Sequence, residues 1–291
     1  MLKLDAQVHV WYSDRPSRPW DPAYRQTNRD RSSFLQHAGQ TNTPEMVLAE
    51  MAEAAVDGVL LTTLGVYGVN NELELAAAER DPERFQVIGV VDHTDLALAD
   101  QLAAATKRGL LGIRVPQMRD PDRIARGEFD DVLKVCSDLR LVVMLPAVNK
   151  QVFNLIKRTP GVFFYMNHLG VGLAPPIVGF RHEAPFENLP AILELAELKN
   201  VGVKLTGLPA LSVEAYPFRD IWPPILQVVA AFGVDRLSWG GDYTRTAGLH
   251  SYWEGANYLA EVQGLSEEQL AWLYAETLIQ RCGWKRSAAF V

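Results

Sequence analysis

The sequence predicts a parallel α/β barrel of eight strand–helix units, the (β/α)8 or TIM barrel. Short runs rich in Val, Ile and Leu alternate with longer amphipathic stretches along the chain, as expected for strands buried beneath helices. The 291 residues accommodate one such barrel of about 250 residues plus insertions. No Gly-x-Gly-x-x-Gly turn follows a strand, which disfavours an open nucleotide-binding sheet. No composition break divides the chain, so we expect residues 1–291 to form a single domain.

The first strand is expected within residues 4–11. Apolar residues at every second position from 2 to 10 alternate with polar ones, a period typical of a strand. This alternation puts Gln7 and His9 on one face and Val8 on the other. A polar stretch, residues 12–43, follows, and a connection of that length in a compact fold is usually functional. We expect it to cover the end of the first strand and to supply wall residues there: Trp20, Tyr24 and His37.

The first barrel helix is expected to begin with Thr43 as N-cap and Pro44 at the first helical position. Its expected apolar stripe is Met46, Val47, Met51 and Val56. The other strands are expected at residues 59–63, 86–91, 110–115, 141–145, 162–168, 201–206 and 236–242. The other barrel helices are expected at residues 72–79, 95–107, 129–137, 150–157, 188–198 and 220–232. Two extra C-terminal helices are expected at residues 252–262 and 267–281.

The composition excludes several classes of protein. With 48% hydrophobic and 22% charged residues and a formal net charge of -7, the chain is typical of a globular protein with a large core. A pI near 5.4 without Lys or Arg clusters gives no support for binding to nucleic acid or to anionic membranes. Cys136 and Cys282 lie far apart in apolar surroundings, as buried thiols of a reducing compartment do. With no signal peptide or membrane span in view, we expect a cytoplasmic protein that acts on a small molecule, and a homo-oligomer stays open.

Polar residues recur where the predicted strands end. In a parallel barrel these ends share one rim, and the reaction site lies there. Such a ring is hard to explain as packing, because charged groups are seldom buried without partners. In chain order the rim holds Gln7 and His9, Thr62 or Thr63, Asp92 or His93, Arg114, His168, Lys204 and Asp242.

Each of these residues also has a structural alternative. His168 could be a core histidine hydrogen-bonded to the backbone, and Asp242 could cap the helix that follows it. Arg114 and Lys204 could pair with Asp92 or Asp242 in structural salt bridges. The sequence by itself leaves these alternatives open.

Four motifs in register resemble the amidohydrolase superfamily, in its amidohydrolase 2 group of TIM-barrel lactonases. That group includes sugar lactonases and a 2-pyrone-4,6-dicarboxylate lactonase, and the resemblance spans practically the whole chain. It implies a TIM barrel that hydrolyses a ring ester. The motifs are Asp5-x-Gln7-x-His9-x-Trp11, Asn167-His168-Leu169-Gly170, Val203-Lys204-Leu205-Thr206-Gly207-Leu208 and Trp239-Gly240-Gly241-Asp242-Tyr243.

The chain departs from the family pattern where the family binds metal. The family's first strand carries His-x-His, whereas this chain has Gln7-x-His9, and His168 and Asp242 match the family's sixth-strand His and eighth-strand Asp. Arg114 is the polar residue on the fourth strand, where binuclear members carry a carboxylated Lys, and the fifth-strand His of mononuclear members is missing. His9 and Asp242 are good zinc ligands, but an amide is a poor one, and His168 completes a set only if it swings in. We therefore expect that no cofactor is required, while a single weakly held divalent metal such as Zn2+ stays open.

The expected function is hydrolysis of a small polar or carboxylated lactone by water. Asp242 is expected to act as the general base, and His9 and His168 to polarise the carbonyl together with Lys204 or the Gln7 amide. The planar guanidinium of an arginine suits a substrate carboxylate, which assigns that contact to Arg114. The remaining substrate contacts are assigned to two aromatic residues: Trp20 and Tyr243.

Three other functions remain compatible with these residues. The same superfamily contains metal-dependent non-oxidative decarboxylases and hydratases of small unsaturated or aromatic acids. Cyclic amide hydrolysis would use the same groups, and a barrel that only binds a small acid would explain Gln7 as a sign of lost catalysis. Substrate choice is expected to lie in residues 12–43 and 170–188. Residues 174–180 with Trp222 could form an apolar lid or an oligomer contact.

Overall fold

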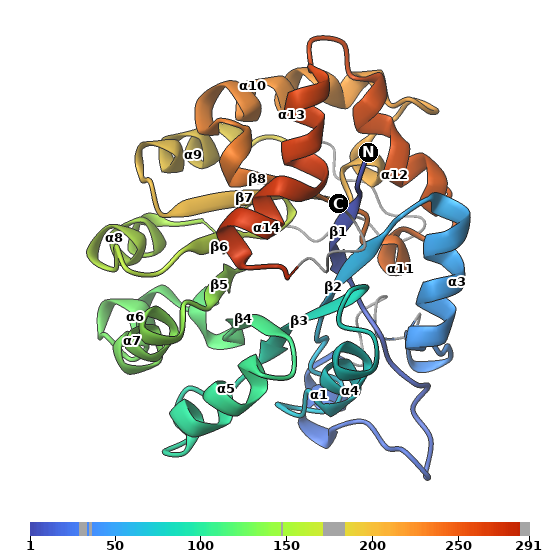
Figure 1. Cartoon of the computed structure of the whole chain (residues 1–291). Helices are drawn as coiled ribbons and strands as arrows, with labels where there is room; N and C mark the ends of the chain where they lie inside the picture. Colours follow the sequence, from blue (N-terminus) through green and yellow to red (C-terminus); the bar gives the residue numbers. More distant parts are fainter. Residues whose placement is uncertain (29–33, 35–36, 147, 171–183, 286–291) are drawn as a thin grey trace.

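The computed structural model describes residues 1–28, 34, 37–146, 148–170 and 184–285. Eight parallel strands form one sheet in chain order, and helices surround it on the outside (Figure 1). The strands are β1 (Leu4–Val8), β2 (Gly58–Thr62), β3 (Phe85–Val90), β4 (Leu110–Arg114), β5 (Val142–Leu145), β6 (Phe164–Met166), β7 (Val201–Thr206) and β8 (Leu237–Gly240). The predicted (β/α)8 barrel is therefore confirmed.

The helices of the described part alternate with the strands, and four of them follow β8. Those up to β8 are α1 (Pro22–Asn28), α3 (Pro44–Ala54), α4 (Glu72–Arg80), α5 (Leu98–Thr106), α6 (Pro121–Ala125), α7 (Asp130–Leu139), α8 (Lys150–Arg158), α9 (Leu189–Glu194) and α10 (Trp222–Phe232). After β8 come the short α11 (Tyr243–Thr246), α12 (Tyr252–Glu261), α13 (Glu267–Ala271) and α14 (Thr277–Cys282). One π-helical turn, Trp272–Glu276, joins α13 to α14, which makes the predicted last helix continuous.

The sheet closes on itself where β8 meets β1. The Asp242 N–H donates to the Gln7 carbonyl oxygen at 2.9 Å. The Asp5 carboxylate adds a side-chain link, since its Oδ1 accepts the Gly241 N–H and its Oδ2 accepts the Tyr252 hydroxyl, both at 2.8 Å. The first and last motifs of the sequence thereby become neighbours in space.

The core has two main layers. One lies between the strands and the surrounding helices and includes Val8, Val59 and Val203. The other fills the barrel interior toward the end where the strands begin, and there Leu4 and Ala6 pack with side chains of the C-terminal segment, including Trp284. The segment with α14 lies across this end of the barrel (Figure 1). The opposite end, where the strands finish, holds the polar residues.

The first strand keeps Gln7 and His9 on one face, as predicted, but not by strict alternation. The β1–β2 register shifts between Asp5 and Val8. Ala6 belongs to the inner core layer and Val8 to the outer one, while the Gln7 amide lies 3.2 Å from the His9 ring inside the barrel. This irregularity brings Ala6 and Gln7 to the interior together, which a period of two does not anticipate.

Two predicted strands end earlier than expected, because the backbone turns at the residues of interest. Residues 162–168 and 236–242 were expected to be extended, yet β6 ends at Met166 and β8 at Gly240. His168 and Asp242 have φ angles of 48° and 49°, in the left-handed region, which no strand can include. Non-glycine residues in this region store strain, and such strain gathers at functional sites.

The Thr43 cap is confirmed, whereas the apolar stripe of α3 is partly wrong. The Thr43 hydroxyl accepts the Met46 N–H, and Pro44 is at the start of the helix. The stripe that faces the core is Pro44, Val47, Met51 and Ala54, and Met46 is 48% exposed. The first-loop helix α1, the short α6 and α11 have no counterpart among the predicted elements.

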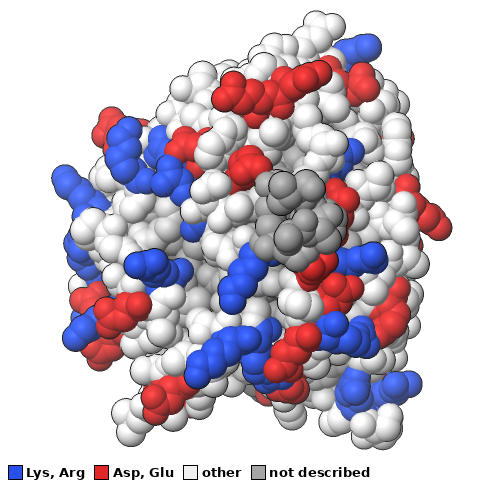
Figure 2. Space-filling view, viewed as in Figure 1, with Lys and Arg blue, Asp and Glu red and all other residues white. Residues whose placement is uncertain are grey.

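The surface and the remaining segments add three observations. Lys and Arg side chains are interspersed with Asp and Glu over the face seen in Figure 2. In the described part of the chain, no helix is long and apolar enough to cross a membrane. The expected lid or oligomer contact at residues 174–180 lies outside the described residues, and the Trp222 indole N–H donates to the Pro217 carbonyl oxygen at 3.0 Å.

Candidate active site

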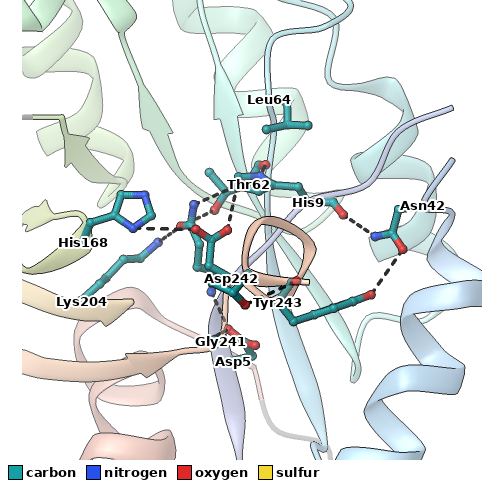
Figure 3. Close-up of polar contacts among 12 residues, drawn as sticks. Asp5, His9, Asn42, Thr62, Leu64, His168, Lys204, Gly241, Asp242 and Tyr243 are labelled. Carbon is teal, nitrogen blue, oxygen red and sulfur yellow. Dashed lines mark hydrogen bonds and ion pairs between the residues drawn. The ribbon is translucent and has the colours of Figure 1, made fainter. Parts of the chain in front are cut away.

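Asp242 lies at the centre of the polar end of the barrel. Its side chain is fully buried, with His9 Nε2 at 3.3 Å from Oδ1 and His168 Nδ1 at 3.8 Å from Oδ2 (Figure 3). Among the described residues, neither carboxylate oxygen has a hydrogen-bond donor. Asp242 precedes α11 but makes no side-chain cap to it, so the helix-capping alternative is wrong. The Asp242 carboxylate is thus an acceptor without a donor in the described part, and it lies beside the imidazole rings of His9 and His168.

The charge states around Asp242 follow from burial and from its neighbours. Burial works to raise the pKa of the Asp242 carboxyl, but His9, Arg245 and His168 together hold it below its ordinary value. Burial lowers the pKa of His168 to about 3, against the attraction of Asp242. At neutral pH the site therefore holds a carboxylate beside a neutral His168. No hydrogen bond from the His168 Nδ1 to any described group is present, so a backbone-bonded core histidine is excluded for this atom.

A chain of contacts runs from Lys204 through Gln7 to His9 in the barrel interior. The Lys204 Nζ lies 2.8 Å from Gln7 Oε1, which also accepts the Thr62 hydroxyl at 3.2 Å. An ammonium only donates, so the atom facing it must be the amide oxygen. The Gln7 Nε2 then faces His9 Nε2 at 3.2 Å, and it acts as the donor.

His9 is held from two other sides. Its Nδ1 lies 2.5 Å from the Thr62 carbonyl oxygen, an acceptor only, which places the ring proton on Nδ1. Its own carbonyl oxygen accepts the Asn42 amide at 2.7 Å, and Asn42 in turn accepts the Tyr243 hydroxyl at 3.4 Å. Tyr243, expected to contact substrate, is thus linked to the His9 backbone through Asn42. Asn42 carries no strand-end signal in the sequence, because it comes from the loop after β1.

Arg114 and Lys204 are not structural ion pairs. In the described part of the chain, neither has a carboxylate within 4.0 Å, and Asp92 instead bonds to Thr94. The Arg114 Nη2 donates to the Leu64 carbonyl oxygen at 2.9 Å, while its buried Nε has no partner among the described groups. Burial lowers the pKa of Arg114 to about 10 and that of Lys204 to about 7. The salt-bridge alternative is therefore wrong, and the rim keeps cationic groups free to meet an anion.

Trp20 does not join the polar residues. It is 1% exposed, packs with Trp11 and Val66, and donates its indole N–H to the Tyr12 carbonyl oxygen at 2.8 Å. His37 from the same loop packs edge-on against Trp11, with ring centroids 4.5 Å apart. Both ring nitrogens of His37 are buried without a partner among the described groups. The loop after β1 thus packs Trp20 and His37 around Trp11, behind the polar residues of the site.

Arg245 is a further candidate for the site, and the sequence did not predict it. It follows Asp242 by one helical turn in α11, and its buried Nε has no partner in the residues described. Its charge contributes to the lowered pKa of both Asp242 and His168. The only indication of Arg245 in the sequence is its position three residues after Asp242, just past the end of the eighth strand.

The residues present do not fit a divalent metal. Within the described residues, no three His, Cys, Asp or Glu side chains form a group that could hold one. His9 and His168 approach different oxygens of Asp242, and Gln7 turns its N–H, not its oxygen, toward His9. The Lys204 ammonium on Gln7 adds a positive charge where a dication would lie. Zinc sites in enzymes usually use three good donors, which this arrangement lacks.

Solved structures share this fold. An amidohydrolase from Burkholderia multivorans, solved with bound HEPES and also with bound zinc, has a TM-score of 0.77 at 19% identity, covering 98% of this chain and all (100%) of that one. A probable 2-pyrone-4,6-dicarboxylic acid hydrolase from Acinetobacter baumannii, solved with citric acid, has a TM-score of 0.70 at 18% identity, covering 97% and 100%. A 5-carboxyvanillate decarboxylase from Sphingomonas paucimobilis has a TM-score of 0.67 at 13% identity, covering 98% and 99%. At these identities the likeness concerns the fold.

Curated relatives match a smaller part of this chain. A 4-sulfomuconolactone hydrolase from Hydrogenophaga intermedia is 26% identical over 184 residues, 61% of this chain and 57% of that protein. One from Rhizobium radiobacter is 25% identical over 208 residues, 68% of this chain and 65% of that protein. The match therefore spans less than two thirds of either relative. A family model described as amidohydrolase matches residues 4–277. This match covers nearly the whole barrel, and the chain belongs to the amidohydrolase family.

Proposed function

We propose that this chain hydrolyses a small lactone that carries an acidic group, with Asp242 as the general base. The observation that carries the proposal is the buried Asp242 carboxylate, which lacks any donor among the described residues and lies 3.3 Å from His9 and 3.8 Å from His168. A water molecule placed against such a carboxylate is activated for attack. The similarity to 4-sulfomuconolactone hydrolases supports a lactone as the substrate.

The reaction balances with water as the only co-reactant. Asp242 takes a proton from water as the water oxygen bonds to the lactone carbonyl carbon. The oxyanion that forms is stabilised by the Lys204 ammonium and by His168, a neutral imidazole that offers one N–H. The ring C–O bond then breaks, and Asp242 returns its proton to the leaving alkoxide. The product is the open hydroxy acid.

His9 and Gln7 fit supporting roles. The His9 Nδ1–H is used by Thr62 and its Nε2 accepts from Gln7, so His9 has no N–H left for the carbonyl. Its ring, 3.3 Å from Asp242, instead lies beside the carboxylate and helps to fix its position. The oxygen of Gln7 is taken by Lys204 and Thr62, which makes Gln7 a positioning residue between the two halves of the site.

Arg114 is proposed to bind the acidic group of the substrate. It is a buried guanidinium whose Nε has no partner among the described groups, and no carboxylate of the described part lies within 4.0 Å of it. A guanidinium binds carboxylate or sulfonate oxygens through paired hydrogen bonds.

We propose that the reaction requires no metal. We also propose that the protein acts in the cytoplasm, where the buried free thiols Cys136 and Cys282 stay reduced.

The test is a panel of five- and six-membered lactones, each with and without a carboxylate or sulfonate. Ring opening is followed by NMR after exhaustive chelation, with Asp242→Asn as the matched variant. We expect hydrolysis of an acid-bearing lactone that survives chelation and falls roughly 10^2- to 10^4-fold in Asp242→Asn. Equal turnover by Asp242→Asn would remove the assigned base. Release of CO2 from an aromatic or unsaturated acid instead of ring opening would favour decarboxylation.

A further inference from the structure

We propose that the Lys204 ammonium, held by the Gln7 amide, stands in this chain where a divalent metal would bind beside His9 and Asp242. The Lys204–Gln7 pair excludes a metal, and the Lys204 ammonium supplies a positive charge in its place. This inference concerns metal affinity and stands independently of the lactone proposed above.

Gln7 is oriented so that it cannot ligate a metal. A metal next to His9 needs a lone pair from the residue two positions earlier, and Gln7 is at that position. Its oxygen already accepts from Lys204 at 2.8 Å and from Thr62 at 3.2 Å. Its N–H side faces His9 Nε2 at 3.2 Å, and an N–H cannot ligate a metal. Gln7 therefore also occupies the His9 lone pair that a metal would use.

The Lys204 ammonium is held in a fixed position. Lys204 is fully buried on β7, with Nζ at 3.4 Å from Met144 Sδ and 5.8 Å from the centre of the Tyr165 ring. These neighbours leave Nζ directed at Gln7, and in Figure 3 the Lys204 side chain lies below His168 and to the left of Asp242. Buried charges are costly without compensation. Asp242 and Lys204 offset each other across the site, and a dication would leave an excess of buried positive charge.

The pair predicts a specific way to convert the site. Replacing Lys204 by Met removes the charge with little change in length, and it releases the Gln7 oxygen. Adding Gln7→His then supplies an imidazole two positions before His9, with Asp242 and His168 already in place. Three imidazoles and a carboxylate match the donors that zinc prefers.

The experiment measures zinc affinity by competition with a chromophoric chelator and metal content after dialysis. The proteins are the unaltered chain, Gln7→His, Lys204→Met and the double variant Gln7→His/Lys204→Met. We expect the double variant to bind one Zn2+ at least 100-fold more tightly than the unaltered chain, with Lys204→Met in between. Adding Asp242→Ala to the double variant should return the affinity to that of the unaltered chain, which identifies the site.

Two results would overturn the proposal. One is an unaltered chain that binds one zinc as tightly as the double variant and loses it with Asp242→Ala. The other is a double variant that melts cooperatively yet binds zinc no better than the unaltered chain. If the double variant does not fold, Lys204→Met decides, since an affinity equal to that of the unaltered chain would show that the ammonium does not exclude the metal. Activity on a lactone enters none of these outcomes, so a wrong substrate leaves them unchanged.

Discussion

The Asp5 carboxylate accepts the Gly241 N–H at 2.8 Å, and so a side chain of the first strand joins the end of the last one. The contact is close. A Cβ at Gly241 would lie 2.5 Å from Asp5 Oδ2 and 2.7 Å from the Tyr252 ring, so only glycine fits there. Asp242 follows directly, and its N–H donates to the Gln7 carbonyl oxygen. The proposed base and the amide that positions Lys204 are thus aligned by the same closure.

The first prediction concerns this closure. Asp5→Ala leaves the N–H groups of Gln7 and Gly241 and the Tyr252 hydroxyl without their acceptor. Because buried polar groups without partners cost about 1–3 kcal/mol each, we expect a loss of about 4 kcal/mol in the free energy of unfolding. Urea unfolding measures it. Tyr252→Phe is the control, since it removes one of the three bonds and should cost about 1 kcal/mol. A smaller loss for Asp5→Ala than for Tyr252→Phe would contradict the role of Asp5.

The fold was predictable because its signals are local. Runs of Val, Ile and Leu locate the strands, and the left-handed turns at His168 and Asp242 shift only their ends. His9, His168 and Asp242 were found because each lies at or just after a strand end, and parallel strands bring those ends together.

The rest of the site depends on contacts between distant residues. Lys204 and Gln7 lie 197 positions apart, and no local pattern tells that one binds the other's oxygen. Asn42 comes from a long loop, where periodicity carries no information, and Asp5 faces β8 only because the barrel closes. Only the three-dimensional structure rejects the salt-bridge alternative for Arg114, because it depends on which carboxylates approach the guanidinium. The sequence therefore predicts that these residues share one end of the barrel, but it does not predict the hydrogen bonds between them.

The second prediction concerns Glu74 on α4, a fully buried carboxyl. Burial raises its pKa from 4.5 to about 7, and the charge of Arg114 opposes this rise only in part. The folded protein therefore holds a proton that the unfolded chain releases above pH 4.5. The associated stability is present below that pH and is lost as the pH rises through about 7. Glu74→Gln keeps the shape without the charge.

We expect Glu74→Gln to be more stable than the unaltered chain at pH 8, by up to about 3 kcal/mol, with a smaller difference at pH 5. Thermal unfolding at the two pH values measures the change. Glu79→Gln on the exposed face of the same helix serves as the control and should show no such pH dependence. A stability difference that is the same at both pH values would show that ionisation of Glu74 is not its cause.

The third prediction concerns Arg114. Its replacement by Met removes a charge-assisted hydrogen bond to the proposed acidic group, worth about 1.5–3 kcal/mol. For an acid-bearing lactone we expect KM to rise roughly 10- to 100-fold with kcat changed much less, because such binding is lost equally from ground and transition states. A neutral lactone should be unaffected. Arg108→Met, which removes an exposed arginine paired with Glu72 and Glu79, is the control. An equal loss on neutral and acidic lactones would argue against this contact.

The fourth prediction concerns the pH dependence of hydrolysis and rests on Lys204. Burial lowers its pKa to about 7, so the ammonium is present below that pH and is lost above it. Since Asp242 keeps its pKa below the ordinary value, it is ionised well below neutrality. We expect kcat/KM to fall as the pH rises through about 7, without an acid limb from Asp242 above about pH 5.

Lys204→Met should lower kcat/KM about 100-fold, the effect of removing one oxyanion donor, and should also abolish the alkaline fall. Lys204→Arg keeps its charge to higher pH, so any activity that it retains should stay level through pH 8. Initial rates of ring opening between pH 5 and 9 give all three profiles. If the fall above pH 7 persisted unchanged in Lys204→Met, another group would be responsible for it, and the ammonium would not be the cation that stabilises the oxyanion.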